Sequence, residues 1–277
     1  MPTKDMVTHV HSQEDSPTVR VGPLTLARLA SKVITILALV LFVCGLAWNF
    51  STRRYLTGFA DAIIPLTGTQ EEKTEALVEW FHHEPRRNIS HATGPSDLMD
   101  DRDPVNIVQS TRLLKICGSA SNAFMNLANA SGLKVRRLLL IDQAGNAKHV
   151  VAEVQWGDRW IVVNPQQGLI FKDKSGHALT RQELRDPKVF QDAISRMPGY
   201  DPQYTFDRTI HVRLSRIPVI GKYMRGILDR SAPGWEEAIN WTYFPEYPPL
   251  WLIFASGPLF LVGILGIHLT RRYPHRK

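Results

Sequence analysis

Two long apolar runs enclose a middle region in which hydrophobic and polar positions alternate. Residues 33–52 contain no Asp, Glu, Lys or Arg, and residues 248–270 contain none either. About 20 such residues at 1.5 Å rise per residue are enough to cross a bilayer. We therefore predict one transmembrane helix at each run. A cleaved signal peptide is the alternative for the first, but its polar leader is long and no small-x-small site follows.

The basic residues predict how these helices are oriented. The net charge is +7, yet four Lys or Arg residues precede the first run and four follow the second, starting at Arg271. Basic residues on the outer side of both runs favour cytoplasmic tails at 1–32 and 271–277. Residues 53–247 then form an extracytoplasmic domain. Because this domain is nearly neutral, the basic pI does not indicate nucleic-acid binding.

The middle region predicts one Cys-bearing helix and an antiparallel sheet. A capping box at Thr69–Glu72 opens a helix that runs to about His82, and residues 117–131 have helical spacing that ends at Gly132. Residues 135–141, 149–156 and 159–164 have the composition of strands. A short helix after Thr180, a strand near residues 209–214 and an amphipathic segment at 218–228 are expected further on. The fold class is α+β.

The dipeptide Gly157-Asp158 is a strong signal for a two-residue hairpin turn and fixes a strand register. If Trp156 pairs with Arg159, Glu153 faces Val162 and Val151 faces Asn164. His149 and Asn164 then lie on one face of the sheet as diagonal neighbours, within reach of each other's side chains. A slip of one residue would place them on opposite faces.

Cys117 is the candidate nucleophile. The chain has two cysteines, and Cys44 lies inside the first apolar run, so a disulfide framework is not expected. Cys117 heads the helix at 117–131, where unpaired backbone N–H groups and the helix dipole favour an anionic thiolate. A buried structural cysteine is the alternative. Cysteine, histidine and a side-chain amide, in the order Cys117, His149 and Asn164, can form an acyl-transfer site.

No metal or cofactor is predicted. The aspartates at 97, 100, 101 and 103 match only fragments of a calcium loop, so we interpret them as a solvated acidic loop. The histidines at 82, 83 and 91 lack partners at regular spacing and are interpreted as surface residues. Glu153 shares the His149 face and could support the site, although a structural role is favoured.

The segments CGSASNAFMNLANASGLKVRRLLL and HVVAEVQWGDRWIVVNP resemble the transglutaminase-like cysteine superfamily. The resemblance covers residues 105–170 and implies a papain-like α+β core, in which the helix bearing the cysteine packs on an antiparallel sheet. It matches Cys117 to the nucleophile and His149 to the base. Asn164 stands where the family usually has Asp; an Asn supplies the orienting hydrogen bond without the charge, as in papain-like enzymes.

We therefore predict a membrane-anchored cysteine hydrolase or acyltransferase acting on amide or ester bonds of a peptide, protein or envelope polymer. The Cys117 backbone N–H would be one oxyanion donor, and Gln109 or Trp80 would be candidates for the second. The resemblance favours a bacterial inner-membrane protein with a periplasmic domain. A catalytically inert binding or scaffold domain of an envelope or polysaccharide assembly is the alternative. A redox thiol is less favoured because the domain has no resolving cysteine.

Overall fold

The structure, a computed structural model, describes residues 23–83, 102–212, 214, 220–238 and 247–272. The chain divides into two units. One contains residues 1–40 and 256–277, and the other contains residues 41–255. The predicted loop aspartates 97, 100 and 101, together with His91, lie outside the described residues.

Two helices have the length and composition of membrane spans. Helix α1 covers Pro23–Ile63 and helix α9 covers Pro248–Arg272. At 1.5 Å per residue, α1 is about 60 Å long, roughly twice the hydrocarbon thickness of a bilayer. The helix therefore continues well past the apolar run that ends at residue 52, and Leu56 and Ala60 of its last turns belong to a hydrophobic core.

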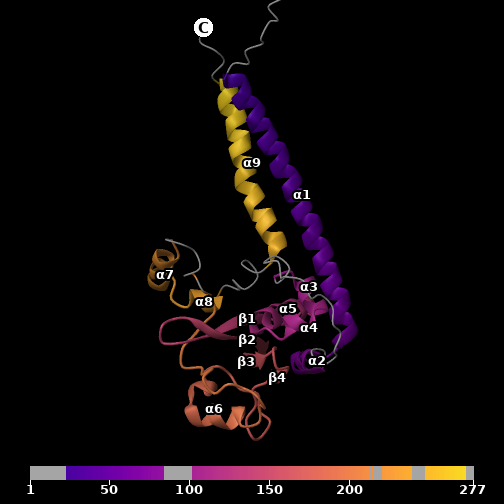
Figure 1. The fold of residues 1–277 in the computed structure, drawn as a ribbon, viewed down its shortest axis with the longest axis vertical. Helices are drawn as coiled ribbons and strands as arrows, with labels where there is room; N and C mark the ends of the chain where they lie inside the picture. The colour runs from indigo at the N-terminus through magenta and orange to yellow at the C-terminus, as the bar shows by residue number, and fades with distance from the viewer. Residues whose placement is uncertain (1–22, 84–101, 213, 215–219, 239–246, 273–277) are drawn as a thin grey trace, which may run out of the picture. The chain divides into compact units, whose positions relative to one another are not determined.

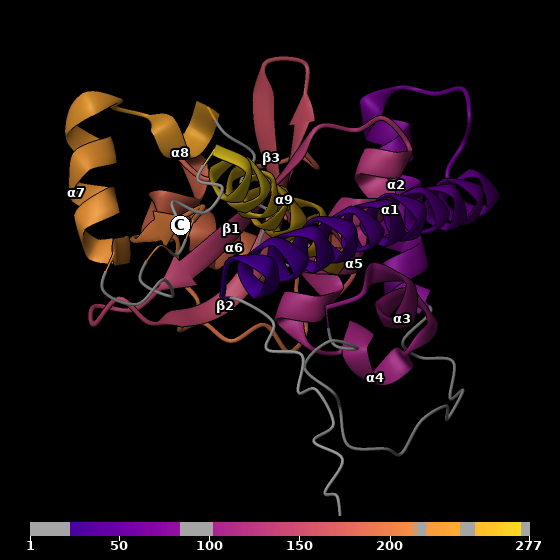
Figure 2. The same ribbon diagram turned by 90° about the horizontal axis from the view of Figure 1, so that it is seen from above.

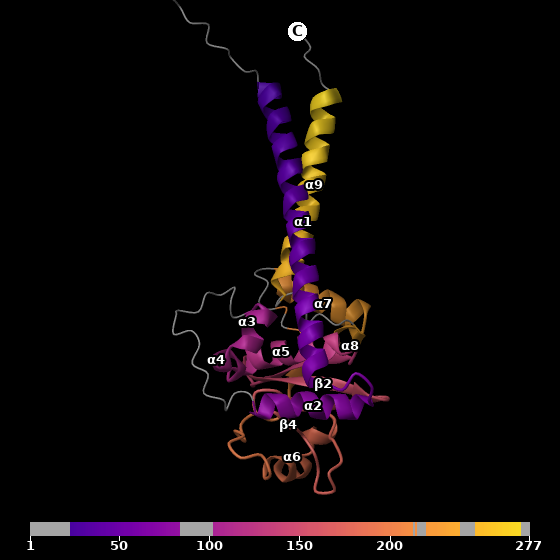
Figure 3. The same ribbon diagram turned by 90° about the vertical axis from the view of Figure 1, so that its right-hand side faces the viewer.

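In the unit of residues 1–40 and 256–277, α1 and α9 run side by side (Figures 1 and 3). Glycines of α9 allow this close approach. A Cβ added at Gly263 would lie 2.3 Å from Thr35 Oγ1, and one added at Gly266 would lie 2.3 Å from Ser31 Oγ. Small residues at such contacts are typical of helix pairs in membranes, where packing replaces the hydrophobic effect.

The unit of residues 41–255 is built on a five-stranded antiparallel sheet of order β4-β3-β2-β1-β5. The strands are β1 (Val135–Ile141), β2 (Ala147–Trp156), β3 (Arg159–Asn164), β4 (Leu169–Ile170) and β5 (Thr209–Ile210). Trp156 pairs with Arg159 and Glu153 with Val162, which confirms the predicted hairpin register. The mixed α and antiparallel β class is confirmed as well.

Helices cover both faces of this sheet (Figures 1 and 3). Helix α5, Cys117–Ala130, lies against β2 and β1. Its Phe124 shares one hydrophobic core with Ala152 and Val154 of β2. Val151 points the opposite way and packs in a second core with Phe171, Phe190 and Phe206. Phe190 belongs to α6, Pro187–Ile194. Residues of β2 thus alternate between the two cores, as the pleat of a strand requires.

The remaining helices are short, and the capping box predicted at Thr69–Glu72 is present at the start of the first of them. They are α2 (Gln70–His83), α3 (Pro104–Gln109), α4 (Thr111–Leu114), a 3₁₀ helix (Glu183–Arg185), α7 (Ile220–Ser231) and α8 (Trp235–Ala238). In the first capping box Thr69 N–H donates to Glu72 Oε2 at 2.8 Å, and Glu72 N–H donates to Thr69 Oγ1 at 3.2 Å. Helices α7 and α8 lie on the other side of this unit from α2, α3 and α4 (Figure 2).

Candidate functional site

Cys117 is the first residue of α5 and is half-buried. Ile116, which precedes it, has an extended backbone and offers no side-chain cap. The first-turn N–H groups of α5 therefore lack the cap that a Ser, Thr or Asp would supply at this position. The guanidinium of Arg137 lies close to this first turn: its Nη2 is 3.6 Å from the position that a Cβ would occupy on Gly118. Both features favour an anion at the helix start.

His149 and Asn164 lie together, as the hairpin register predicts. His149 is 4% exposed and Asn164 is fully buried. Both belong to the sheet face that carries Val151 and Val162, and both line one cavity of about 300 Å³. The cavity is polar, and its lining consists of Lys115, His149, Asn164, Gln166, Gln167, Gly199, Tyr200, Asp201 and Tyr204.

Burial controls the charge of His149. It lowers the pKa of the imidazole to about 4, against the opposing effects of the Asn164 side chain and the Asp201 carboxylate. The ring is therefore neutral at physiological pH and able to accept a proton. His149 Nε2 and Asn164 Oδ1 are both buried, and neither has a hydrogen-bond partner among the described residues.

Two tyrosines that sequence reasoning missed enclose the histidine. The Tyr204 ring stacks on the His149 ring, with centroids 4.7 Å apart and planes 7° apart. Tyr200 meets His149 edge-on at 6.1 Å, and burial raises the pKa of its hydroxyl. Both lie between β4 and β5, 36 and 40 residues after Asn164, in a segment without periodicity. The one signal that could have indicated them is the pair of tyrosines flanking Asp201 at a spacing of four.

Two hydrogen bonds position the start of α5 at the end of the sheet where β2 begins and β3 ends. Gln166 Nε2, two residues beyond Asn164, donates to the carbonyl of Lys115 at 2.8 Å. Ser121 Oγ, one helical turn after Cys117, donates at 3.1 Å to the carbonyl of Val150, the neighbour of His149. Cys117 lies between these two contacts in the sequence. All three predicted site residues therefore gather at one end of the sheet.

The thiol and the imidazole are not in hydrogen-bond contact. Helix α5 packs on the face of Ala152 and Val154, whereas His149 belongs to the opposite face. Cys117 is not among the residues that line the His149 cavity, and no described residue bonds to His149 Nε2. The two side chains can meet only around the end of the sheet.

The other residues considered from the sequence have different partners. Gln109 Nε2 donates to the Tyr55 hydroxyl at 2.9 Å, and Trp80 packs edge-on against Phe59 and Phe81. Asp103 caps α3 by accepting from Val105 N–H at 2.9 Å. Each of these contacts has a structural role, so the positions of Gln109 and Trp80 add no second oxyanion donor to the site.

Glu153 lies on the His149 face but belongs to a separate buried charge cluster. Its Oε2 accepts from Arg136 Nε at 2.6 Å and interacts with His211 Nε2 at 2.8 Å. Arg181 Nε lies 4.0 Å from the other carboxylate oxygen. Burial alone would raise the pKa of Glu153, but His211 and Arg136 outweigh it and hold that pKa below its usual value. Arg136 also stacks over Trp160, 4.1 Å from the ring centroid.

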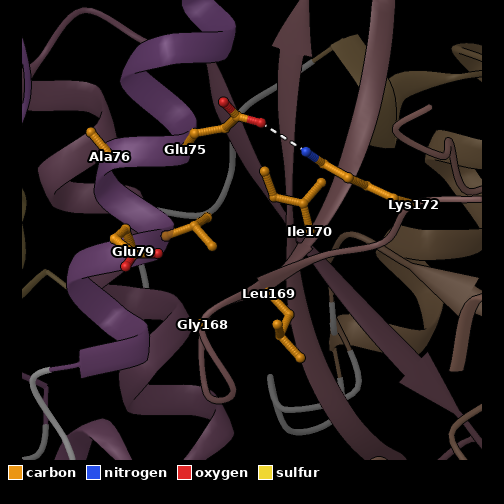
Figure 4. Close-up of a pocket in the computed structure, with 8 residues that line it drawn as sticks. Glu75, Ala76, Glu79, Gly168, Leu169, Ile170 and Lys172 are labelled. Carbon is orange, nitrogen blue, oxygen red and sulfur yellow. Dashed lines mark hydrogen bonds and ion pairs between the residues drawn. The ribbon is translucent and has the colours of Figure 1, made fainter. Parts of the chain in front are cut away.

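A larger cavity of about 540 Å³ lies elsewhere, between α2 and β4. Figure 4 shows the Glu75–Lys172 ion pair spanning its upper part, with Leu169 and Ile170 extending from the β4 side. The Nζ–Oε1 distance of this ion pair is 2.7 Å. The cavity is lined largely by apolar side chains and contains none of the predicted catalytic residues, so we do not assign the chemistry to it.

No protein-family model matches this chain, and neither does any curated protein sequence.

Proposed function

We propose that the chain is a membrane-anchored, transglutaminase-like cysteine enzyme that transfers acyl groups from amide or ester bonds through Cys117, His149 and Asn164. The observation that carries this proposal is the pair of hydrogen bonds, Gln166 to Lys115 and Ser121 to Val150, which hold the Cys117 helix start against the strand ends bearing the other two residues. Catalytic hydrogen bonds are often long in enzymes without substrate and tighten in the complex.

In this mechanism the thiol gives its proton to the neutral imidazole of His149 as its sulfur attacks the carbonyl carbon. The C–S bond forms, and the C–N or C–O bond breaks as His149 returns the proton to the leaving group. Water or an amine then releases the acyl group from the thioester. Asn164 orients the imidazole, and its own Nδ2 is fixed by a 3.0 Å hydrogen bond to Gln167 Oε1. The Cys117 N–H donates to the developing oxyanion.

A second candidate function is a binding domain without catalysis. It is favoured by the cavity itself, which contains His149, Asn164 and two tyrosines but not the thiol. In that case the polar cavity would hold a peptide or glycan segment of an envelope assembly, and Cys117 would be a structural residue of α5.

Thiol labelling distinguishes the two functions. In a Cys44→Ser background Cys117 is the single cysteine, so iodoacetamide incorporation at neutral pH reports on it alone. Acyl transfer predicts rapid labelling that His149→Ala slows on the order of a hundredfold. Lys148→Ala changes an exposed neighbour on β2 and serves as the matched control. Labelling that is unchanged by His149→Ala favours the binding domain.

We also propose that the domain of residues 41–255 lies outside the cytoplasm, in a bacterial inner membrane, with both termini inside. The basic residues beyond each span, including Arg271 and Arg272, support this orientation. A reporter that is active only in the periplasm should be silent when fused after Lys277, and activity there would reverse the orientation.

A further inference from the structure

A third cavity of about 330 Å³ lies within the unit of residues 41–255. It is lined by residues of α1, α5 and the start of α9: Arg53, Leu56, Thr57, Asn126, Asn129, Ala130, Tyr247 and Leu250. All of these residues belong to the same unit. The cavity thus combines one guanidinium, two side-chain amides and a phenol with apolar side chains. It is separate from the cavity that contains His149.

The sequence positions of its lining place this cavity at the depth of lipid headgroups. Arg53 is the first charged residue after the apolar stretch 33–52, and Tyr247 immediately precedes α9, which begins at Pro248. Arg and Tyr residues at such boundaries are characteristic of the membrane–water interface. Nearby, Arg102 lies over the ring of Trp251, 5.4 Å from its centroid, and adds a second cation at this level.

The polar side chains of the cavity differ in how far they are satisfied: Asn126 Nδ2 donates to Asn122 Oδ1 at 2.6 Å, whereas Arg53 and Tyr247 offer groups for a ligand. Arg53 is exposed, and no described carboxylate forms an ion pair with it. Tyr247 is 4% exposed, yet its hydroxyl has no hydrogen-bond partner among the described residues. Burial raises the pKa of Tyr247 while the charge of Arg53 opposes that rise, so the guanidinium acts on the same hydroxyl. A buried polar group without a partner costs stability unless a ligand supplies one.

Two negative features oppose an anion here, and their summed charge is smaller than that of the two cations. The C-terminal end of α5 directs its partial negative charge toward Asn129 and Ala130. Asp103 also acts on Tyr247, and accepting the Val105 N–H of α3 does not remove the charge of its carboxylate. The two full positive charges of Arg53 and Arg102 still exceed the sum of one carboxylate and the roughly half charge of a helix end.

We propose that this cavity binds the phosphate headgroup of an anionic membrane lipid. Arg53 and the Tyr247 hydroxyl hold the phosphate, the Asn129 amide contacts the polar headgroup, and Leu56 and Leu250 contact the first carbons of the acyl chains. Free phosphate shares the charge but not the chains, and the apolar part of the lining favours the lipid. The bound lipid joins α5, the helix that begins with Cys117, to the membrane boundary.

Native mass spectrometry of the full chain tests this site. Protein purified in a neutral detergent is mixed with phosphatidylglycerol or phosphatidylcholine, and the retained lipid is counted. We expect phosphatidylglycerol to be retained about tenfold better, and Arg53→Gln to abolish this preference. Arg54→Gln, which changes an exposed arginine outside the cavity, should leave the preference intact, and Arg53→Lys should keep most of it.

Three results would overturn the assignment. Equal retention of the two lipids, or a preference that survives Arg53→Gln, would show that the cavity does not select an anionic headgroup. Displacement of the lipid by millimolar inorganic phosphate, with an Arg53-dependent rise in Tm from phosphate alone, would assign the site to the free ion. Lipid retention by Cys117→Ala protein should equal that of the unchanged chain, because the thiol takes no part in lipid binding. The lipid site is therefore tested independently of the acyl-transfer proposal.

Discussion

His149 is the residue whose surroundings decide what the site can do. Its imidazole is buried under Tyr204 on a face of the sheet that faces away from α5, and it stays neutral to about pH 4. A neutral imidazole cannot hold a preformed ion pair with the thiolate. It can act as a general base at the moment of attack. Asn164, which carries no charge, is consistent with this arrangement because no imidazolium has to be stabilised before substrate binds.

The buried histidine predicts a pH dependence of stability. In the unfolded chain a histidine has a pKa near 6.5, and burial lowers that of His149 to about 4. Between these values the unfolded state binds a proton that the folded state does not, so the folded state loses stability as the pH falls from about 6.5 to 4. At pH 5 the loss should be about 2 kcal/mol.

Variants isolate this contribution. His149→Gln should remove the loss of unfolding free energy that His149 causes between pH 7 and pH 5. His177→Gln, which changes an exposed histidine, should leave that loss in place. The measurement is the free energy of unfolding of the detergent-solubilised chain at pH 7 and pH 5. Parallel declines in the two variants would mean that His149 is not buried as described.

At the scale of single elements, local sequence patterns were enough to predict many of the helices and strands. The two-residue turn at Gly157-Asp158 fixed the register that brings His149 and Asn164 together, and the Cys117 helix begins where its periodicity predicts. Long-range contacts could not be predicted in this way. Tyr204 reaches His149 from a segment without periodicity, and His211 reaches Glu153 across 58 positions. Neither partner is distinguishable in sequence from a surface residue.

The cluster around Glu153 connects elements from distant parts of the chain, so removing its central charge should be costly. Glu153→Gln would leave Arg136 buried without its carboxylate partner, while Arg181 would keep its ion pair with Glu237, and should destabilise the fold by about 3–5 kcal/mol. Glu75→Gln removes the exposed partner of Lys172 and should cost less than about 1 kcal/mol. Denaturant titration of both variants measures the difference. Similar small losses would show that the cluster does not stabilise the fold.

At the scale of the whole molecule, two apolar helices enclose the α+β domain in the sequence and pair with each other near the chain ends. The sequence predicted both runs from their length and lack of charge, but not that α1 extends to Ile63 and contributes to the domain core. Polar residues such as Arg53 and Arg54 end the apolar pattern without ending the helix. Composition alone therefore marks the membrane boundary and misses the helix boundary.

The contact between α1 and α9 can be tested with two glycines of the same helix. Gly263→Ala would place a methyl group 2.3 Å from Thr35 Oγ1 and should lower the Tm of the solubilised chain. Gly257→Ala meets no atom within 4 Å, and alanine's higher helix propensity should hold or raise the Tm by an amount corresponding to at most about 1 kcal/mol. Equal Tm values for the two variants would contradict the close packing.

The central claim, acyl transfer by Cys117, is tested most directly with an activated ester. Full-length protein carrying Cys44→Ser is mixed with p-nitrophenyl acetate, p-nitrophenol release is followed by absorbance, and the protein is mapped by mass spectrometry. We predict a burst equal in amount to the protein, an acetyl group on Cys117, and loss of both in His149→Ala. Release at the same rate from Cys117→Ala protein, with no acetyl group on Cys117 of the parent, would contradict the account.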